Sequence, residues 1–352
     1  MVLWFGGSNT SEPQNFQTFK PSPCTRALEK ATLYPVFEAF QIGPFLFRSS
    51  IICLLIGIML SVDLFMRIVQ KEGLRITLFL RRGVWFAVAF LLFGRLFALL
   101  LLYRVYVQDP LRAFIFWDGE FSTVGGCIGI VVMLCFFLWR EQEMFLVWLD
   151  ALFPSMTLLF TFDWFGRLLG ALSYGKPTNM PWGITLESMH VRYTVPVHPV
   201  QLYYTFWFLG VTILLLLLHK RRFGDTMTFG GRKGFGFPTL LGTFLGCLGV
   251  LFFEYYRGDF AITIFAKLTD FVFLACLFVS LGILTVIERK ISPRYSLMNG
   301  VIVGFGTIAY LLLRPFITVA SVEWRFSQFL AVLAMIATVV YVYAYRWKYQ
   351  QH

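Results

Sequence analysis

Residues 45–69 read FLFRSSIICLLIGIMLSVDLFMRIV, a stretch in which the only charged side chains are Arg48, Asp63 and Arg67. A helix needs about 20 mostly apolar residues to cross the hydrocarbon core of a bilayer, so this stretch predicts a transmembrane helix. Similar stretches recur along the chain of 352 residues, of which 58% are hydrophobic and 14% are charged. Soluble domains have about 25% charged residues. The sequence therefore predicts an all-α, polytopic integral membrane protein.

Nine apolar stretches predict about nine transmembrane helices. They cover residues 45–69, 84–103, 123–139, 145–172, 199–218, 237–253, 262–286, 297–319 and 329–345. Tyr and Trp gather near their ends, as is typical of side chains at a membrane interface.

The basic residues between these helices predict the orientation. Clusters of Lys and Arg follow the first, fifth, seventh and ninth helices, around Arg75, Arg221, Arg289 and Arg346. Cytoplasmic loops carry an excess of Lys and Arg, so the N-terminus is expected outside and the C-terminus inside. Because the basic residues lie in short clusters between apolar stretches, the formal net charge of +11 favours anionic lipid over nucleic acid as the partner.

Cysteine placement predicts neither a disulfide framework nor a metal site. Five of the six cysteines lie inside apolar stretches, where Cys packs as a small hydrophobe, and Cys24 alone lies in a polar segment. No CxxC pair or His/Cys cluster occurs, and no cofactor is predicted. Residues 1–30 lack the basic head and apolar stretch of a cleavable signal peptide, so the first helix is expected to direct insertion.

Several ionisable residues fall within predicted helices, where they are costly and therefore candidates for function. Asp163 and Arg167 are four residues apart and share one helix face, so a structural ion pair and a functional site are equal alternatives for Arg167. Arg95 is another such residue. For Asp63 and Asp270 a structural pairing is favoured.

A second group of candidates lies at the start of the fifth helix. His198 precedes Pro199, and Gln201 follows three residues later, so His198 and Gln201 are expected on one face as a polar patch. Such a patch at a helix start could hold an anionic head group. Upstream, residues 174–178 (YGKPT) and 181–183 (PWG) form a loop suited to lining a polar cavity.

Two further motifs each have a structural and a functional interpretation. Glu254 and Arg257 are three residues apart, which fits either a salt bridge or an Arg that faces a phosphate. Gly125 and Gly126, near the start of the third helix, fit either small-residue packing or a place in a site.

Taken in order, these motifs resemble the bacterial phosphatidylglycerol–prolipoprotein diacylglyceryl transferase family. The resemblance covers about residues 40 to 285. Its motifs are 42–44 (IGP), 121–126 (FSTVGG), 166–167 (GR), 174–178, 181–183, 198–203 (HPVQLY) and 254–257 (EYYR). The 198–203 block and the upstream YGKPT are the more specific ones.

The resemblance implies a seven-helix core open sideways to lipid, in the bacterial cytoplasmic (inner) membrane. It implies transfer of diacylglycerol from phosphatidylglycerol to the lipobox cysteine of a prolipoprotein, whose signal peptide is the second partner. Such chemistry needs cationic donors for the phosphate and a base or polarised site for the thiol. Catalytic roles are expected for Arg167, His198 and Arg257. Substrate-binding roles are expected for Lys176, Gln201, Tyr203, Glu254, Gly125 and Gly126.

The chain also departs from the family pattern. Val124 stands where the family has a His, Val250 where it has an Arg, Ser50 where it has a Tyr, and Tyr204 where it has a Glu. The stretch between Arg167 and Tyr174 is three residues short of the family's. One helical turn is about that long, so Arg167 can still face the same site.

Two other functions remain as alternatives. The substituted positions fit a catalytically silent paralogue that binds lipid or lipoprotein, and ionisable residues within helices also occur in secondary transporters. In all cases the expected organisation is an N-terminal non-cytoplasmic segment at 1–40, a transferase-like core at 41–287, and two extra helices with a cytoplasmic tail at 288–352.

Overall fold

The computed structural model describes residues 32–34, 39–42, 45–101, 106–107, 111, 121–141, 145–186, 188, 191–222, 228–229, 232–233, 236–259, 263–286, 293–318 and 321–350. The predicted segment 1–40 lies largely outside these residues, as do Cys24, Gly43, Pro44 and Arg289.

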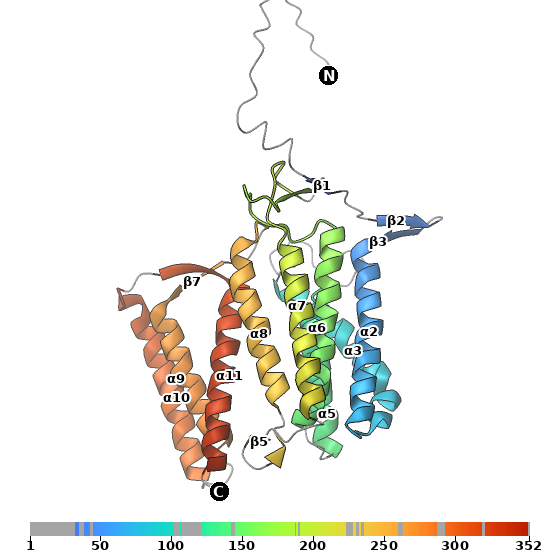
Figure 1. Cartoon of the computed structure of the whole chain (residues 1–352). Helices are drawn as coiled ribbons and strands as arrows, with labels where there is room; N and C mark the ends of the chain where they lie inside the picture. Colours follow the sequence, from blue (N-terminus) through green and yellow to red (C-terminus); the bar gives the residue numbers. More distant parts are fainter. Residues whose placement is uncertain are drawn as a thin grey trace, which may run out of the picture.

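Nine helices of 17 or more residues occur in the described part of the chain, which confirms the predicted helical membrane fold (Figure 1). Their bounds are α2 (Ser49–Lys71), α3 (Ile76–Leu101), α5 (Thr123–Glu141), α6 (Phe145–Leu169), α7 (Val200–Arg222), α8 (Phe237–Phe253), α9 (Leu268–Val286), α10 (Pro293–Leu313) and α11 (Phe326–Gln350).

Length and apolar composition allow five described segments to cross a membrane, those of α2, α3, α7, α8 and α10. Shorter apolar stretches lie in α5, α9 and α11. The remaining helix, α6, carries Asp150, Asp163 and Arg167 among its apolar residues. It packs against α2, α5, α7 and α8; Asp163 and Arg167 pair with each other within α6, and Asp150 has its partners at the start of α8.

The helices pack in an order that differs from their order along the chain. Helix α6 packs against α2, α5, α7 and α8, and α3 packs mainly against α5. Beyond α8 comes α11, the last helix, with α9 and α10 outside it (Figure 1). The neighbour of α8 on this side is therefore the C-terminal helix.

Short strands replace predicted helix at two places. Phe45–Arg48 is strand β3, paired with β2 (Ala39–Ile42), and α2 begins only at Ser49. Residues Thr263–Lys267 are strand β7, paired antiparallel with β8 (Ser321–Arg325) just before α11. These pairings satisfy backbone groups at the helix ends, a role that hydropathy alone does not reveal.

Helix α3 begins eight residues before the predicted start at residue 84. Arg81 and Arg82 therefore belong to the helix instead of the preceding loop. The guanidinium of Arg82 lies 4.5 Å from the ring centroid of Phe137, and Arg81 is exposed. Long basic side chains near a helix end can extend along apolar surface in this way, so charge alone does not mark a loop.

Asp150, near the start of α6, fixes the start of α8. Its Oδ2 accepts a hydrogen bond from the backbone N–H of Gly236 (2.6 Å), and its Oδ1 accepts from the backbone N–H and the hydroxyl of Thr239 (3.1 and 2.7 Å). A carboxylate at a helix N-terminus satisfies N–H groups that have no partner within the helix. The fully buried Asp150 is thus explained as a cap that ties α6 to α8.

The two ends of the bundle differ in character. The strand pair β5 (Thr228–Phe229) and β6 (Arg232–Lys233), which follows α7, lies at one end. The loop between α6 and α7, with strand β4 (Ile184–Leu186) on β1 (Thr32–Tyr34), lies at the other (Figure 1). The motif-bearing loop and the basic loop after α7 are thus at opposite ends, as the charge pattern predicted.

Candidate functional site

The 174–178 loop (YGKPT) bonds both to the start of α7 and to the end of α8. The backbone N–H of Lys176 donates to the carbonyl of Tyr256 (2.7 Å), and the N–H of His198 donates to the carbonyl of Lys176 (3.0 Å). The N–H of Gly258 donates to the carbonyl of Tyr174 (2.9 Å). The YGKPT loop, the start of α7 and the end of α8 are therefore held together by backbone bonds, although they are far apart in sequence.

Two glycines permit this close approach. A Cβ atom on Gly175 would lie 2.2 Å from the carbonyl oxygen of His198, and one on Gly258 would lie 2.4 Å from the carbonyl oxygen of Gly175. No side chain fits at such distances from a backbone oxygen. Glycine is therefore required at both positions for the three segments to meet.

His198 lies among aromatic side chains. Its Nδ1 is 3.2 Å from the hydroxyl oxygen of Tyr203, and Trp182 Nε1 donates to the same oxygen at 2.8 Å. The ring of Tyr256 is 5.0 Å from the His198 ring, centroid to centroid. Burial lowers the pKa of His198 below its ordinary value of about 6.5, because it disfavours the charged imidazolium. The imidazole is thus neutral at pH 7.

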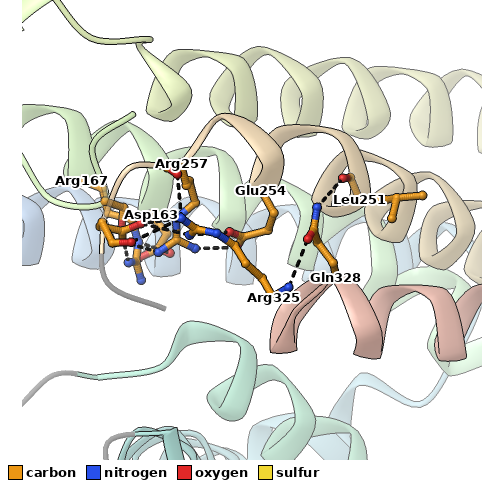
Figure 2. A network of polar contacts seen from close by, with 9 residues as sticks. Asp163, Arg167, Leu251, Glu254, Arg257, Arg325 and Gln328 are labelled. Atoms are coloured by element: carbon orange, nitrogen blue, oxygen red, sulfur yellow. Dashed lines mark hydrogen bonds and ion pairs between the residues drawn. The ribbon is translucent and has the colours of Figure 1, made fainter. Parts of the chain in front are cut away.

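A buried charged cluster lies at the end of α8, in a short 3-10 turn (Glu254–Tyr256) and the residues after it (Figure 2). Arg257 Nη1 donates to Glu254 Oε1, while its Nε and Nη2 donate to the Asp259 carboxylate. Burial alone would lower the pKa of Arg257, but Glu254 and Asp259 outweigh burial and raise it above its ordinary value. The guanidinium is fixed as a cation.

Arg325 enters the same cluster from β8, directly before α11 (Figure 2). Its Nη1 lies 3.3 Å from both Glu254 Oε2 and Asp259 Oδ1, and its Nη2 donates to the carbonyl of Arg257 at 2.6 Å. Gln328, one turn into α11, accepts from the N–H of Arg325 and donates to the carbonyl of Leu251. The cluster thus joins α8 to α11.

Arg167 reaches the neighbourhood of this cluster from α6. Its Nε donates to Asp163 (3.1 Å), which confirms the predicted pair, and its Nη1 donates to Ser173 (3.2 Å). Its Cζ lies 5.2 Å from the ring centroid of Trp164, and that of Arg257 lies 5.9 Å from the same centroid. The two guanidinium groups therefore share one indole ring.

The chain between α6 and the YGKPT loop is short and strained. Ala171 and Ser173 have φ values of 50° and 55°, in the left-handed region that residues with a side chain rarely adopt. Leu172 between them accepts a hydrogen bond from Gln201 Nε2 at 2.8 Å, and Ser173 accepts from Arg167. The surrounding contacts hold this backbone, a pattern common at functional sites.

The predicted polar patch of His198 and Gln201 is wrong. Gln201 is fully buried and points to Leu172, whereas His198 points to Tyr203 and Tyr256. His198 lies outside α7, and its N–H pairs with the loop carbonyl of Lys176, so the three-residue helical spacing does not apply to it. Gln201 anchors the turn after α6.

The nearest neighbours of Gly125 and Gly126 are residues of α3 and not residues of the charged cluster. A Cβ at Gly125 would lie 2.4 Å from Phe97, and one at Gly126 would lie 2.5 Å from Phe90, both on α3. This placement agrees with the packing interpretation, in which small residues let two helices approach closely. Their predicted substrate-binding role stays a prediction.

Lys176 differs from the two arginines in its partners. Its Nζ lies 4.5 Å from the ring centroid of Tyr255, and the side chain is exposed. Within the described residues no carboxylate contacts its ammonium. Among the described residues, Lys176 is thus a cation at the site whose charge is not matched by an acidic partner.

Asp63 and Asp270, expected to be structural, do have partners, and so does Arg95, for which no role was predicted. Asp63 accepts from Arg67 at 2.8 Å on the exposed face of α2. Asp270 binds Arg314, as described below, and the Arg95 guanidinium lies 5.4 Å from the centroid of the Tyr106 ring. None of these groups contacts Arg257 or His198 in the described structure.

Four positions that depart from the family pattern have distinct surroundings. Val124 is half exposed at the start of α5. Tyr204 is buried and stacks on Trp164, 3.9 Å between centroids, and Val250 packs in the same cluster. The Cα of Ser50 would lie 3.1 Å from a Cβ on Gly166. Of the four positions, Tyr204 and Val250 thus lie in the same hydrophobic cluster as Trp164, over which Arg257 lies.

The sequence did not indicate Trp164, Asp259 or Arg325 as part of the site. Asp259 follows Arg257 by two residues and was a visible candidate. Arg325 is 68 residues from Arg257, a separation that no local pattern spans. In the part of the chain that is described, no group of three or more His, Cys, Asp or Glu is placed to hold a metal ion.

The fold and the cluster define a polytopic helical membrane protein with buried arginine–carboxylate pairs at one end of its bundle. The family described as prolipoprotein diacylglyceryl transferase matches residues 37–344. This match covers most of the chain, and the protein belongs to that family.

Individual relatives are distant. The chain is 27% identical over 183 residues to the phosphatidylglycerol–prolipoprotein diacylglyceryl transferase of Synechocystis sp., across 51% of this chain and 65% of that protein. The enzyme of the same name from Streptomyces griseus is 26% identical over 279 residues, 78% of this chain and 79% of its own. That from Pseudomonas fluorescens is 30% identical over 149 residues, 42% and 55% respectively. The matched part thus spans just under two thirds of the Synechocystis protein.

Proposed function

We propose that this protein transfers a diacylglyceryl group from phosphatidylglycerol to the cysteine thiol of a prolipoprotein. In this reaction a sulfur–carbon bond forms at the glycerol carbon of the diacylglyceryl group. The bond between that carbon and the phosphate oxygen breaks, glycerol phosphate leaves with the electron pair, and the thiol proton passes to a base. Family membership and the names of the relatives support this function.

The observation that carries the proposal is that Arg167, Lys176 and Arg257 lie at the same end of the bundle as His198. Arg167 and Arg257 share the Trp164 ring, and Lys176 is bonded through its backbone to both His198 and Tyr256. Negative charge grows on the phosphate as its bond breaks, and fixed cationic donors stabilise that charge.

Arg167 and Arg257 have N–H groups that can still donate to the lipid phosphate. A guanidinium carries five N–H groups. Among the described residues, Arg257 uses its Nε and one N–H on each terminal nitrogen, and Arg167 uses its Nε and one N–H on Nη1. The carboxylates hold both groups in place without using all their donors. Preorganised donors of this kind need no rearrangement when charge develops.

His198 is suited to take the thiol proton. It is neutral at pH 7 because burial lowers its pKa. When its Nδ1 carries the proton and donates to Tyr203, Nε2 has a free lone pair, as a base requires. The contact between Trp182 and Tyr203 then fixes the orientation of the acceptor. Tyr203 thereby acts as a positioning residue.

The second candidate is a catalytically silent protein of this family that binds lipid or lipoprotein. The half-exposed Val124 and the apolar contacts of Val250 favour it, because neither position offers a polar group to the cluster. Family membership gives no support to the transporter alternative.

We further propose that α9 and α10 are a helix pair inserted into a seven-helix core, with α11 as its seventh helix. Helix α11 packs on α8, and the family match continues to residue 344, within α11. This organisation replaces the predicted boundary at residue 287. The positive-inside pattern supports an inner-membrane orientation with the cluster outside and the C-terminus in the cytoplasm.

The proposed function is tested with purified protein in vesicles that contain phosphatidylglycerol. A synthetic lipobox peptide is added, and its mass and gel mobility are followed. The peptide is expected to gain one diacylglyceryl group, and none in vesicles of phosphatidylcholine alone. Peptide binding without a mass gain would support the silent alternative and contradict the proposal.

A further inference from the structure

Arg325 contacts both carboxylates that bind the Arg257 guanidinium. Glu254 and Asp259 bind the Arg257 guanidinium, and Arg325 Nη1 lies 3.3 Å from each of these carboxylates. Its Nη2 donates to the carbonyl of Arg257 itself and also lies 3.3 Å from the carbonyl of Asp259. The side chain is 16% exposed, so these contacts form largely away from solvent.

The charge of the cluster depends on Arg325. Glu254 and Asp259 contribute two negative charges, and Arg257 and Arg325 contribute two positive charges. Without Arg325 the cluster would carry a net charge of −1 next to the place where an anionic head group is proposed to bind. In a site with little solvent, one uncompensated carboxylate repels a phosphate strongly.

No other described cation is placed to take over this role. Val250 lies one turn before Glu254 on α8, where a basic residue would be within reach of it, but Val250 packs among apolar and aromatic side chains. Arg325 reaches Glu254 instead from the strand before α11. The Gln328 bridge between the N–H of Arg325 and the carbonyl of Leu251 holds the end of that strand against α8, and β7 pairs with the strand along its length.

From these contacts we infer that Arg325 is a positioning residue for the anionic lipid head group. It neutralises the second carboxylate and braces the 254–259 turn, so that Arg257 can present its remaining donors to a phosphate. Arg325 itself acts through Arg257. The inference rests on the proposed function for the choice of phosphatidylglycerol as ligand.

The test measures binding of dioctanoyl phosphatidylglycerol to the full-length protein in phosphatidylcholine nanodiscs. Arg325→Gln is expected to raise the Kd about tenfold, the size of a lost charge–charge contact in a partly buried site. Arg325→Lys keeps the charge but loses the forked contacts of the two terminal nitrogens, so its Kd is expected to lie between those of Arg325→Gln and wild type. The matched control is Arg314→Gln, which removes an arginine–carboxylate pair outside the cluster and should leave the Kd unchanged.

A merely structural role gives a different result. Partial unfolding lowers the number of binding sites but leaves the Kd of the folded fraction unchanged, so Arg325→Gln with wild-type Kd would overturn the inference. So would a failure of Arg325→Lys to recover affinity while Arg325→Gln is impaired. If wild type binds the lipid in an Arg325-dependent way but transfers nothing to a lipobox peptide, the proposed function fails and this inference stands. If wild type transfers the diacylglyceryl group and Arg325→Gln has the same KM and Kd as wild type, the proposed function stands and the inference about Arg325 fails.

Discussion

Two arginine–carboxylate networks lie toward the same end of this molecule and differ in what they connect. The first, the α8 cluster, consists of Glu254, Arg257, Asp259 and Arg325 and joins the end of α8 to the start of α11. The second, which we term the α9–α10 latch, consists of Lys267, Asp270, Tyr310 and Arg314. The first is surrounded by the motif-bearing loop, and the second is not.

In the latch the side-chain contacts of Asp270 and Lys267 join the start of α9 to the end of α10. Asp270 accepts from Arg314 Nε and Nη2 (2.8 and 3.0 Å), from the Tyr310 hydroxyl (2.6 Å) and from the N–H of Lys267 (2.8 Å). The ammonium of Lys267 donates to the carbonyls of Arg314 and Ile317. An ionisable residue near a membrane helix end is thus fully explained by local pairing.

The α8 cluster is not explained in this way. Its Arg257 shares the Trp164 ring with Arg167 and, among the described residues, keeps N–H groups that have no acceptor. The loop that bonds to Tyr256 and Gly258 also carries Lys176, whose carbonyl accepts from His198. The comparison teaches that an intramembrane ion pair by itself does not indicate function. The groups that surround the pair determine whether it can bind a ligand, so substitutions in the two networks should affect transfer differently.

The largest effect is expected for Arg257→Ala. Loss of the central donor should lower kcat/KM for diacylglyceryl transfer about 10²- to 10³-fold, the size found when a preorganised donor to a developing charge is removed. The rate is measured with the peptide mass assay at matched amounts of folded protein. Transfer within a factor of about three of wild type would remove Arg257 from the site.

If His198 is the base, the rate of transfer should depend on pH. Its folded-state pKa is lowered below about 6.5, so the neutral base persists at pH 7 and is lost only as pH falls below that value. Transfer should therefore stay level from pH 8 to about 6.5 and decline in more acidic buffer. His198→Asn should slow transfer about 100-fold and abolish this acidic decline. A variant that keeps the decline would show that another group is responsible.

Lys176→Gln should have a moderate effect. The exposed ammonium is screened by solvent, so its loss is expected to raise KM for phosphatidylglycerol about three- to tenfold with little change in kcat. Lys176→Arg, which keeps the charge, should remain close to wild type. The rates are measured over a range of lipid fractions in the vesicles, and an unchanged KM would exclude a role for Lys176 in lipid binding.

The smallest effect on transfer is expected for Arg314→Gln in the latch. This change should alter kcat/KM less than about twofold, because Arg314 contacts Asp270 and not the α8 cluster. It should instead loosen α10 from α9, which amide hydrogen exchange in the two helices would report. A loss of transfer as large as that of Arg257→Ala would erase the distinction between the two networks.

Hydropathy and charge predicted much of the architecture. The nine helices and the opposite placement of the basic loop after α7 and the motif loop follow from apolar length and parity, which are local properties of the chain. The pairs Asp163–Arg167 and Glu254–Arg257 follow from helical spacing. These features need no knowledge of which helices are neighbours.

Features that depend on distant packing could not be predicted in the same way. The sequence order suggests that α9 lies beside α8, whereas α11 takes that place and carries Arg325 into the cluster. Gln201 was placed with His198 by counting residues, but His198 lies in an extended segment and Gln201 binds the strained turn at Leu172. The Asp150 carboxylate accepts from the N-cap residue of α8, Gly236, which is 86 residues away in sequence.

The central claim is that the α8 cluster holds the phosphate of the lipid substrate, and an experimental structure with bound phosphatidylglycerol tests it most directly. The protein would be reconstituted in nanodiscs rich in this lipid and imaged by electron cryomicroscopy. The account predicts phosphate density within hydrogen-bonding distance of Arg257, with Arg167 and Lys176 beside it. Ordered head-group density at Arg314 and Lys267, with none at Arg257, would contradict it.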